Sequence, residues 1–269
     1  MFKWQKYGLL FLMLIAACET EYNIEFLYEN VQQLVVDGII TNENKPQLIK
    51  LSLTNNEINA GENPLSGASV TVSDQDSSYV FTESFTEAGA YYSVPFTGVV
   101  EKVYHLEIEI ESHYFEAYAE MTGINSMENF YAVPAEEGNL YRYVYQESSL
   151  PSMTDVLYDW SEVPWYCTQY GSYRAIETFY TLHNVDVNEV FGPAREIIYF
   201  PPGTTIIRKK YSLSDEHQEY LRSLLIETEW RGGLFDVQQG NVTSNISNGG
   251  LGFFGACMVM TDTTLFLTP

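Results

Sequence analysis

The residue with the clearest chemistry is Cys18, which follows an N-terminal segment suited to export. Two lysines give that segment a positive start, an apolar run follows, and two alanines precede the cysteine. This order is typical of a secretory signal peptide, and the apolar run is too short to span a bilayer comfortably. In Leu14-Ile-Ala-Ala-Cys18 the cysteine stands where a bacterial lipobox places the thiol that is acylated before cleavage. We therefore predict a lipoprotein signal peptide over residues 1–17 and lipidation of Cys18.

Two other interpretations of this segment stay open. Cys18 is incidental if the segment is a plain cleaved signal peptide, and a retained anchor helix is the other alternative. The acidic Cys18-Glu-Thr-Glu21 is similar to the tether signal that sends Bacteroidota lipoproteins to the cell surface, although a solvated linker has the same composition. We predict that residues 18–33 link the anchor to the fold.

The other two cysteines are Cys167 and Cys257. A disulfide between them is one interpretation, because the chain is predicted to reach an oxidising compartment. It would close a loop of roughly 90 residues and contribute about 4 kcal/mol if its geometry is relaxed. Two separate buried thiols are the alternative, since Cys257 lies in an apolar, strand-like run. Neither cysteine has a partner at metal-ligand spacing, so we expect no zinc site.

The sequence lacks the common catalytic motifs. It contains no Gly-x-Ser-x-Gly elbow, no His-Glu-x-x-His helix and no phosphate-binding loop. It has four histidines, at positions 105, 113, 183 and 217. We expect His105 in a strand, His113 in a turn and His217 early in a helix, and lone histidines of this kind are typical of surface or core groups. We predict that the chain is not an enzyme and holds no cofactor.

Carboxylates are abundant but form no recognisable site. Asp74 with Asp76, and Asp186 with Glu189, do not complete a calcium-binding loop. The glutamates at 107, 109 and 111 are expected to form a solvated row along a strand, and no pair stands out for glycoside cleavage. We therefore predict no metal site.

The charge of the chain excludes some partners. Lys and Arg number 13 against 36 Asp and Glu, and removing the two signal-peptide lysines gives 11 − 36 = −25. Nucleic acid requires a basic footprint that this chain lacks, and anionic lipid heads would also be repelled. The balance suits a solvated protein outside the cytoplasm that meets the membrane through a lipid anchor. The 21 tyrosines and 15 phenylalanines favour strands, and tyrosine-rich surfaces also occur at interfaces.

The first half of the predicted mature chain has the pattern of strands separated by turns. Residues 47–53 alternate, with Ile49, Leu51 and Leu53 on one face, and residues 103–111 alternate still more clearly. Further strand candidates are 34–40, 64–72, 79–82, 89–94 and 114–120. About seven short strands with no helix between them are typical of an immunoglobulin-like β-sandwich. We predict such a domain over residues 34–122.

Residues 123–269 are predicted to form a second β-rich domain. Its strand candidates are 140–146, 173–181, 196–200, 204–211, 251–260 and 264–267. Residues 148–171, rich in proline and tryptophan, are predicted to be a long loop. One main helix is predicted near 214–230, because Ser214 is a suitable N-cap, acidic residues follow it, and apolar residues recur at helical spacing from Tyr220.

Several segments form a pattern along nearly the whole mature chain. They are Cys18, Leu34-Val-Val-Asp-Gly-Ile-Ile40, Pro64-Leu-Ser-Gly-Ala-Ser-Val-Thr-Val72, Gly89-Ala-Tyr-Tyr92, Val103-Tyr-His-Leu-Glu-Ile108, the helix at 212–229, Gly232-Gly-Leu-Phe235, Asn245-Ile-Ser-Asn248 and Gly250-Leu-Gly-Phe-Phe254. Together they resemble a family of Bacteroidota lipoproteins known as domain-of-unknown-function family four-two-four-nine, and the glycine- and phenylalanine-rich last segment is the most specific. One departure is Gln238-Gln-Gly-Asn-Val242, which stands where the family often has a proline-rich tract.

The resemblance implies an accessory role rather than an activity. Members of the family accompany SusC-like TonB-dependent receptors, which are outer-membrane β-barrel proteins. We therefore expect a non-enzymatic, lipid-anchored protein of the outer membrane, exposed at the cell surface, that is an accessory or ligand-binding partner of such a transporter. A structural subunit of a large outer-membrane assembly or secretion machine is the alternative. An undiscovered hydrolase is a third hypothesis, which a pocket with converging histidine and carboxylate groups would favour.

Overall fold

The computed structural model describes residues 32–55, 60–136, 138–163, 165–166, 172–183, 196–230 and 242–267. Within these residues the protein is mainly β, with three sheets and one helix. This confirms the predicted fold class. The predicted signal peptide, Cys18 and Cys167 lie outside the described residues.

The first sheet has eight strands in the order β14-β1-β2-β5-β4-β3-β6-β7. These strands are β1 (Leu34–Thr41), β2 (Lys45–Leu53), β3 (Ser69–Ser73), β4 (Ser78–Glu83), β5 (Ala90–Phe96), β6 (Val103–Ile110), β7 (His113–Glu120) and β14 (Leu251–Cys257). Their alternating sequences bury every second side chain, as Ile49 and Leu51 of β2 illustrate at no more than 1% exposure. One apolar core receives side chains from all eight strands.

The N-terminal sheet is rolled around that core, and its two edge strands come into contact. Hydrogen bonding joins all eight strands into a single sheet, where an immunoglobulin-like sandwich has two, and β7 and β14 contact each other. The segment 245–248 closes the gap between them. Asn245 Nδ2 donates to Tyr118 O (3.2 Å) and to Phe254 O (2.7 Å), and its Oδ1 accepts from Phe254 N at 3.0 Å. The Asn-Ile-Ser-Asn motif therefore has a structural role.

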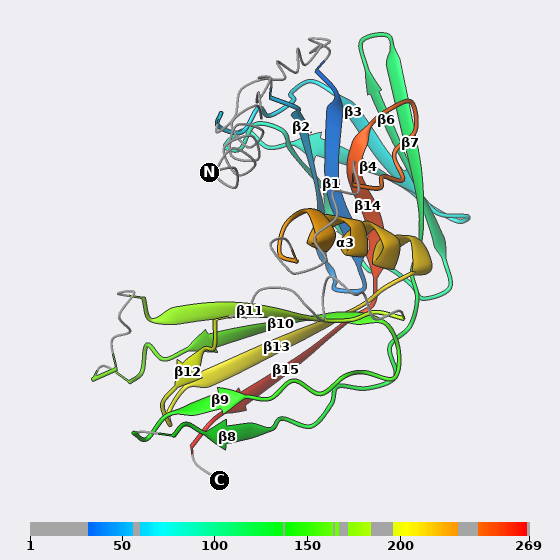
Figure 1. Cartoon of the computed structure of the whole chain (residues 1–269). Coiled ribbons are helices and arrows are strands. Elements are labelled where there is room, and N and C mark those ends of the chain that lie inside the picture. Colours follow the sequence, from blue (N-terminus) through cyan, green and yellow to red (C-terminus); the bar gives the residue numbers. More distant parts are fainter. Residues whose placement is uncertain are drawn as a thin grey trace, which may run out of the picture. The chain divides into compact units, whose positions relative to one another are not determined.

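The C-terminal strand β14 belongs to the first sheet, although the sequence places it in the second region. It lies parallel to β1 in a register that runs from Val35 opposite Leu251 to Thr41 opposite Cys257 (Figure 1). The predicted single strand over residues 251–260 is interrupted at Met258, and β15 (Val259–Leu265) continues in the second sheet. At this break a side chain replaces a strand neighbour as the hydrogen-bond partner of the backbone, because Ser212 Oγ accepts from Met258 N at 2.8 Å.

The second sheet has the order β11-β10-β13-β15, and a third, smaller sheet has the order β12-β9-β8. Their strands are β8 (Ala132–Pro134), β9 (Tyr141–Tyr143), β10 (Ser152–Asp159), β11 (Arg174–Thr181), β12 (Tyr199–Phe200) and β13 (Thr205–Ser212), besides β15. The predicted loop over residues 148–171 was wrong where β10 lies. The buried face of β10 includes Ser152 and Thr154 beside Val156 and Tyr158. Because serine and threonine occupy buried positions, the sequence of this strand does not show the usual alternation of apolar and polar residues.

The helix α3 (Asp215–Glu227) confirms the predicted helix and its N-cap, because the Ser214 side chain accepts from His217 N at 3.3 Å. It ends before the predicted residue 230, since Thr228 has a non-helical backbone. The helix packs on β14, where the Phe253 ring stacks against both His217 and Tyr220 with ring centroids 4.7 Å apart. No helix within the described residues is long and apolar enough to cross a membrane.

The two large sheets are linked at the end of the first sheet where β1 finishes. There Asn42 Oδ1 accepts from Val259 N at 2.7 Å, and Ser212 Oγ donates to Thr122 O at 2.7 Å. The described chain enters at the opposite end, where the start of β1 pairs with Leu53 at the end of β2. The first sheet therefore separates the point of chain entry from the second sheet.

Candidate functional site

One recess lies beside the first turns of α3. We call it the helix recess, and it is lined by Leu182, His183, Asp215, Gln218, Glu219 and Arg222 around a volume of ≈ 300 Å³. The four helix residues are three or four positions apart and so share one face of α3. His183 reaches that face from the segment that follows β11.

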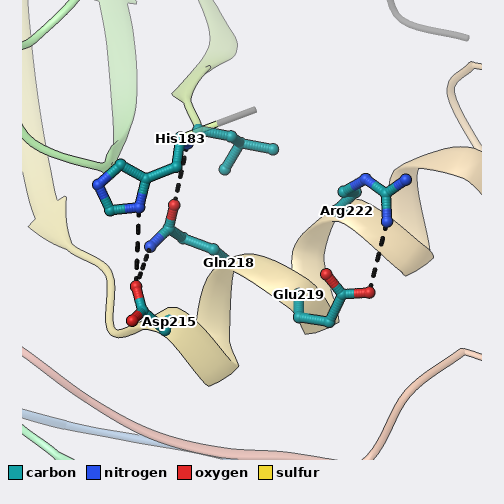
Figure 2. A pocket seen from close by; sticks show the side chains of 6 residues that line it. His183, Asp215, Gln218, Glu219 and Arg222 are labelled. Atoms are coloured by element: carbon teal, nitrogen blue, oxygen red, sulfur yellow. Dashed lines mark hydrogen bonds and ion pairs between the residues drawn. The ribbon is translucent and has the colours of Figure 1, made fainter. Parts of the chain in front are cut away.

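A small hydrogen-bond network fixes the helix recess (Figure 2). The backbone N–H of His183 donates to Gln218 Oε1 at 3.1 Å, and Gln218 Nε2 donates to Asp215 Oδ1 at 3.1 Å. The imidazole Nδ1 of His183 lies 3.7 Å from the same carboxylate oxygen. Arg222 Nη1 donates to Glu219 Oε1 at 3.4 Å, farther along the helix. Amide, imidazole, guanidinium and carboxylate groups therefore face one small volume.

The chemistry of the helix recess is that of polar recognition. None of its six lining residues is a serine, threonine, cysteine, tyrosine or lysine, so the side-chain nucleophiles in this lining are limited to its carboxylates and the imidazole. The Asp215 side chain is 87% exposed and that of His183 is 63% exposed, which keeps both groups in water. The recess offers donors and acceptors to a polar ligand or to a partner's polar side chains.

A second recess lies on the three-stranded sheet and has a different lining. We call it the sheet groove, and it has a volume of ≈ 630 Å³ lined by Val133, Pro134, Ala135, Glu136, Leu140, Arg142, Ile197 and Tyr199. Ile197 is 51% exposed and Tyr199 is 37% exposed. A mostly apolar lining with one acid and one base is typical of a site that binds an apolar side chain and orients it with a few polar contacts.

The buried pair of His217 and Cys257 does not form a catalytic dyad. Cys257 Sγ lies 3.5 Å from His217 Nδ1, and both residues are buried. Burial raises the pKa of the Cys257 thiol to about 12 and lowers the pKa of His217 to about 4. Both groups are therefore neutral near pH 7, whereas a cysteine nucleophile needs its thiolate. Because Cys167 lies outside the described residues, the disulfide between it and Cys257 stays a prediction.

The carboxylates considered from the sequence have structural partners. Asp74 Oδ2 and Asp76 Oδ2 accept from Lys102 Nζ at 3.1 and 2.7 Å, so this acidic turn binds a lysine. Glu107 and Glu109 lie on β6, but Glu111 lies in the following turn with a positive φ and leaves the predicted row. Asp186 and Glu189 lie outside the described residues. No cluster with metal-ligand composition occurs in the described part of the chain.

Sequence reasoning missed both recesses. The polar residues at positions 215, 218, 219 and 222 can be recognised in the sequence as one helix face. The prediction of the helix rests on its apolar face instead. The approach of His183 to that stripe depends on tertiary packing, and the sheet groove depends on strands of two or three residues. No local pattern marks such strands.

Comparison with known proteins gives one family. A family model described as Domain of unknown function (DUF4249) matches residues 19–263, which is nearly the whole chain. The match covers every described strand from β1 to β14 and the helix. No curated protein matches.

Proposed function

We propose that this chain, which belongs to the family described as Domain of unknown function (DUF4249), is a non-enzymatic lipoprotein of the bacterial outer membrane. It is anchored through Cys18 and acts as an accessory, ligand-binding partner of a TonB-dependent transporter of the SusC type in Bacteroidota. The lipobox sequence and the acidic surface support the anchor and the solvated location.

The observation that carries the proposal is the position and lining of the sheet groove. The groove belongs to the region beyond the end of the first sheet, whereas the chain enters at that sheet's other end. A chain tethered through Cys18 would thus present the groove away from its point of attachment. Exposed Ile197 and Tyr199 beside Arg142 give the groove the mixture of apolar, aromatic and arginine groups that is enriched at protein interfaces.

Affinity purification through a tag on the C-terminal end, in mild detergent, tests the partnership. We expect a TonB-dependent receptor to be recovered in comparable amount with the wild-type chain. The variant Ile197→Asp should lose it, because a carboxylate in the groove is desolvated on docking. The control Ile176→Asp changes a residue on β11 that is 65% exposed, against 51% for Ile197, and should retain the receptor.

Two outcomes contradict the proposal. Recovery of the wild-type protein alone removes the partner hypothesis, and recovery of a multi-subunit assembly without a receptor favours the structural-subunit alternative. The anchor is tested separately, by flotation of the wild-type chain and of Cys18→Ala with membrane vesicles. Only the wild-type chain should float.

The helix recess supports a second candidate, the hydrolase. His183 and two carboxylates converge there, with His183 Nδ1 3.7 Å from Asp215 Oδ1. In such a hydrolase either a lining carboxylate is the nucleophile or a bound water attacks with the imidazole as general base. Turnover of ester or glycoside substrates that disappears in both His183→Ala and Asp215→Asn would establish this function. Turnover that survives in both variants would exclude this recess as its source.

A further inference from the structure

The turn between β4 and β5 exposes one aromatic side chain completely. Phe85 has a relative exposure of 105%, the highest of the large hydrophobic residues within the described chain. Burying a phenyl ring is worth several times the thermal energy, so its full exposure to water is unfavourable for an isolated protein. A large apolar side chain that is held exposed in this way is a candidate for insertion into another apolar phase.

The turn that carries Phe85 is well supported by hydrogen bonds. Ser84 Oγ accepts from the backbone N–H groups of Thr86 (3.2 Å) and Glu87 (3.3 Å). The carboxylate of Glu83 accepts from Gly67 N and Gly89 N, each at 3.0 Å. These bonds fix the backbone on both sides of Phe85, so the ring projects from a defined turn.

Charge near the ring is partly neutralised. Glu87, two residues after Phe85, pairs with Lys50 Nζ at 2.7 Å. The Glu83 carboxylate stays anionic, because hydrogen bonds from Ser66 and from backbone donors lower its pKa. The surroundings of Phe85 therefore suit a surface of little net charge better than an anionic one.

The turn lies at the end of the first sheet where the chain enters. Leu51 N donates to Gly89 O at 2.8 Å, and Lys50 is opposite Ala90, so the turn adjoins the end of β2. The start of β1 pairs with that same end of β2. β4 is three strands from β1 in the sheet, which places the turn roughly 15 Å sideways from the entry point.

The lipid anchor would be close to this end. Residues 18–31 separate Cys18 from the described fold, and a fully extended chain of that length spans at most roughly 50 Å. A protein tethered by so short a segment meets the membrane surface often, and the entry end is the part that the tether draws toward it. Aromatic side chains are favoured at the boundary between headgroups and acyl chains.

We propose that Phe85 inserts into the lipid bilayer beside the anchor, at the boundary between headgroups and acyl chains. This inference rests on the proposed lipidation of Cys18. It gives the first sheet the role of orienting the protein on the membrane, with the turn of Phe85 as a second point of attachment. A lipid anchor alone allows the protein to rotate about its tether, whereas a second contact with the membrane restricts that rotation.

Quenching of an introduced tryptophan tests the proposal. The full-length lipidated variants Phe85→Trp and Val80→Trp are reconstituted into phosphatidylcholine vesicles that contain brominated lipid. Val80 is the matched control, because it is 66% exposed on β4 but lies away from the turn. After subtraction of the wild-type signal, we expect the emission of the Phe85→Trp variant to fall about twofold and that of the Val80→Trp variant to be unchanged.

Each other outcome overturns the insertion. Equal emission losses in the two variants show that lipid contact is not specific to the turn, and no loss in either shows that the turn stays out of the bilayer. A blue-shifted emission of Phe85→Trp without quenching shows that protein rather than lipid covers the turn. Flotation of the wild-type chain distinguishes the failures: if it floats and Phe85→Trp is unquenched, only the insertion is wrong. If it does not float, the anchor and the insertion are both wrong.

Discussion

The first and second sheets bury different kinds of side chain on strands of similar length. In β6 the most buried side chains are those of Tyr104, Leu106 and Ile108, all at no more than 1% exposure. In β13 the buried positions include Arg208 at 3% and Lys210 at 1%. The first core is closed by non-directional apolar packing, whereas the second depends on specific partners for two buried cations.

The partners of those cations come mainly from the segment that connects the two large sheets. Lys210 Nζ donates to both oxygens of Glu128, at 2.7 and 2.8 Å, and to Ser126 O at 2.9 Å. Arg208 Nη1 donates to Glu128 O at 2.8 Å. These contacts of buried cations hold the connecting segment on the second sheet. We therefore predict that removing a charge lowers stability more in the second sheet than in the first.

Glu128→Gln is expected to have the largest effect. It leaves the Lys210 ammonium buried without its anionic partner, and breaking such a pair costs about 3 kcal/mol. The free energy of unfolding, measured by urea denaturation, should fall by that amount. The matched change Glu109→Gln, on the exposed face of β6, should change it by less than about 0.5 kcal/mol. Similar losses in both variants would contradict the comparison.

Acid is expected to act through His217, at the contact between α3 and β14. Burial lowers the pKa of this side chain from 6.5 to about 4 in the folded protein. Between those values the unfolded chain binds a proton that the folded protein does not, so stability is complete above pH 6.5 and falls as the pH decreases. The loss approaches roughly 3 kcal/mol near pH 4. The measurement is the free energy of unfolding against pH.

Two variants separate this titration from packing. His217→Gln removes the titrating group, so its stability should change about 3 kcal/mol less between pH 6.5 and 4 than that of the wild type. Phe253→Leu removes the stacked ring and should lower stability at every pH without changing the slope. An unchanged slope in His217→Gln would assign the acid sensitivity to other groups.

Asn245→Ala should destabilise the rolled sheet by about 2 kcal/mol, because the side chain's one hydrogen bond to β7 and two hydrogen bonds to β14 are lost while the backbone groups that it satisfied remain. Asn55→Ala removes one exposed bond, to Gly61 O at 2.6 Å, and is the control with little expected effect. Hydrogen exchange should show faster exchange of the Phe254 amide in the first variant only. Protection retained there would mean that the edges close without this side chain.

The smallest expected effect is a gain in stability. The hydroxyl oxygen of Thr122 is buried and has no hydrogen-bond partner in the structure, although the Thr122 carbonyl accepts from Ser212. Thr122→Val replaces that hydroxyl with a methyl group of similar shape and should raise the free energy of unfolding by about 0.5–1 kcal/mol. A loss of similar size would mean that the hydroxyl is satisfied in solution.

The difference between the sheets also explains what the sequence could predict. The strands of the first sheet follow apolar alternation, so β2, β6 and their neighbours were predictable from the period alone. The face of β10 that includes Ser152 and Thr154, and the cations of β13, break that period because their burial depends on partners far away in the sequence. The helix and its cap were predictable because Ser214 and the following acids are local signals.

The site was less predictable than the fold. The helix recess needs His183 to reach α3, and the sheet groove needs residues from two separate segments, near 133–142 and near 197–199. No spacing rule connects such residues. The predicted lipidation of Cys18 is the opposite case, because that prediction rests on five consecutive residues.

The parallel pairing of β14 with β1 sets an order of events during folding. β1 lacks this neighbour until residues 251–257 have been made, so the first sheet cannot close around its core before then. A pairing so distant in sequence forms slowly, because the long intervening loop must close before the two strands can make contact. For the export that we propose, such a delay would help to keep the chain unfolded while it crosses the membrane.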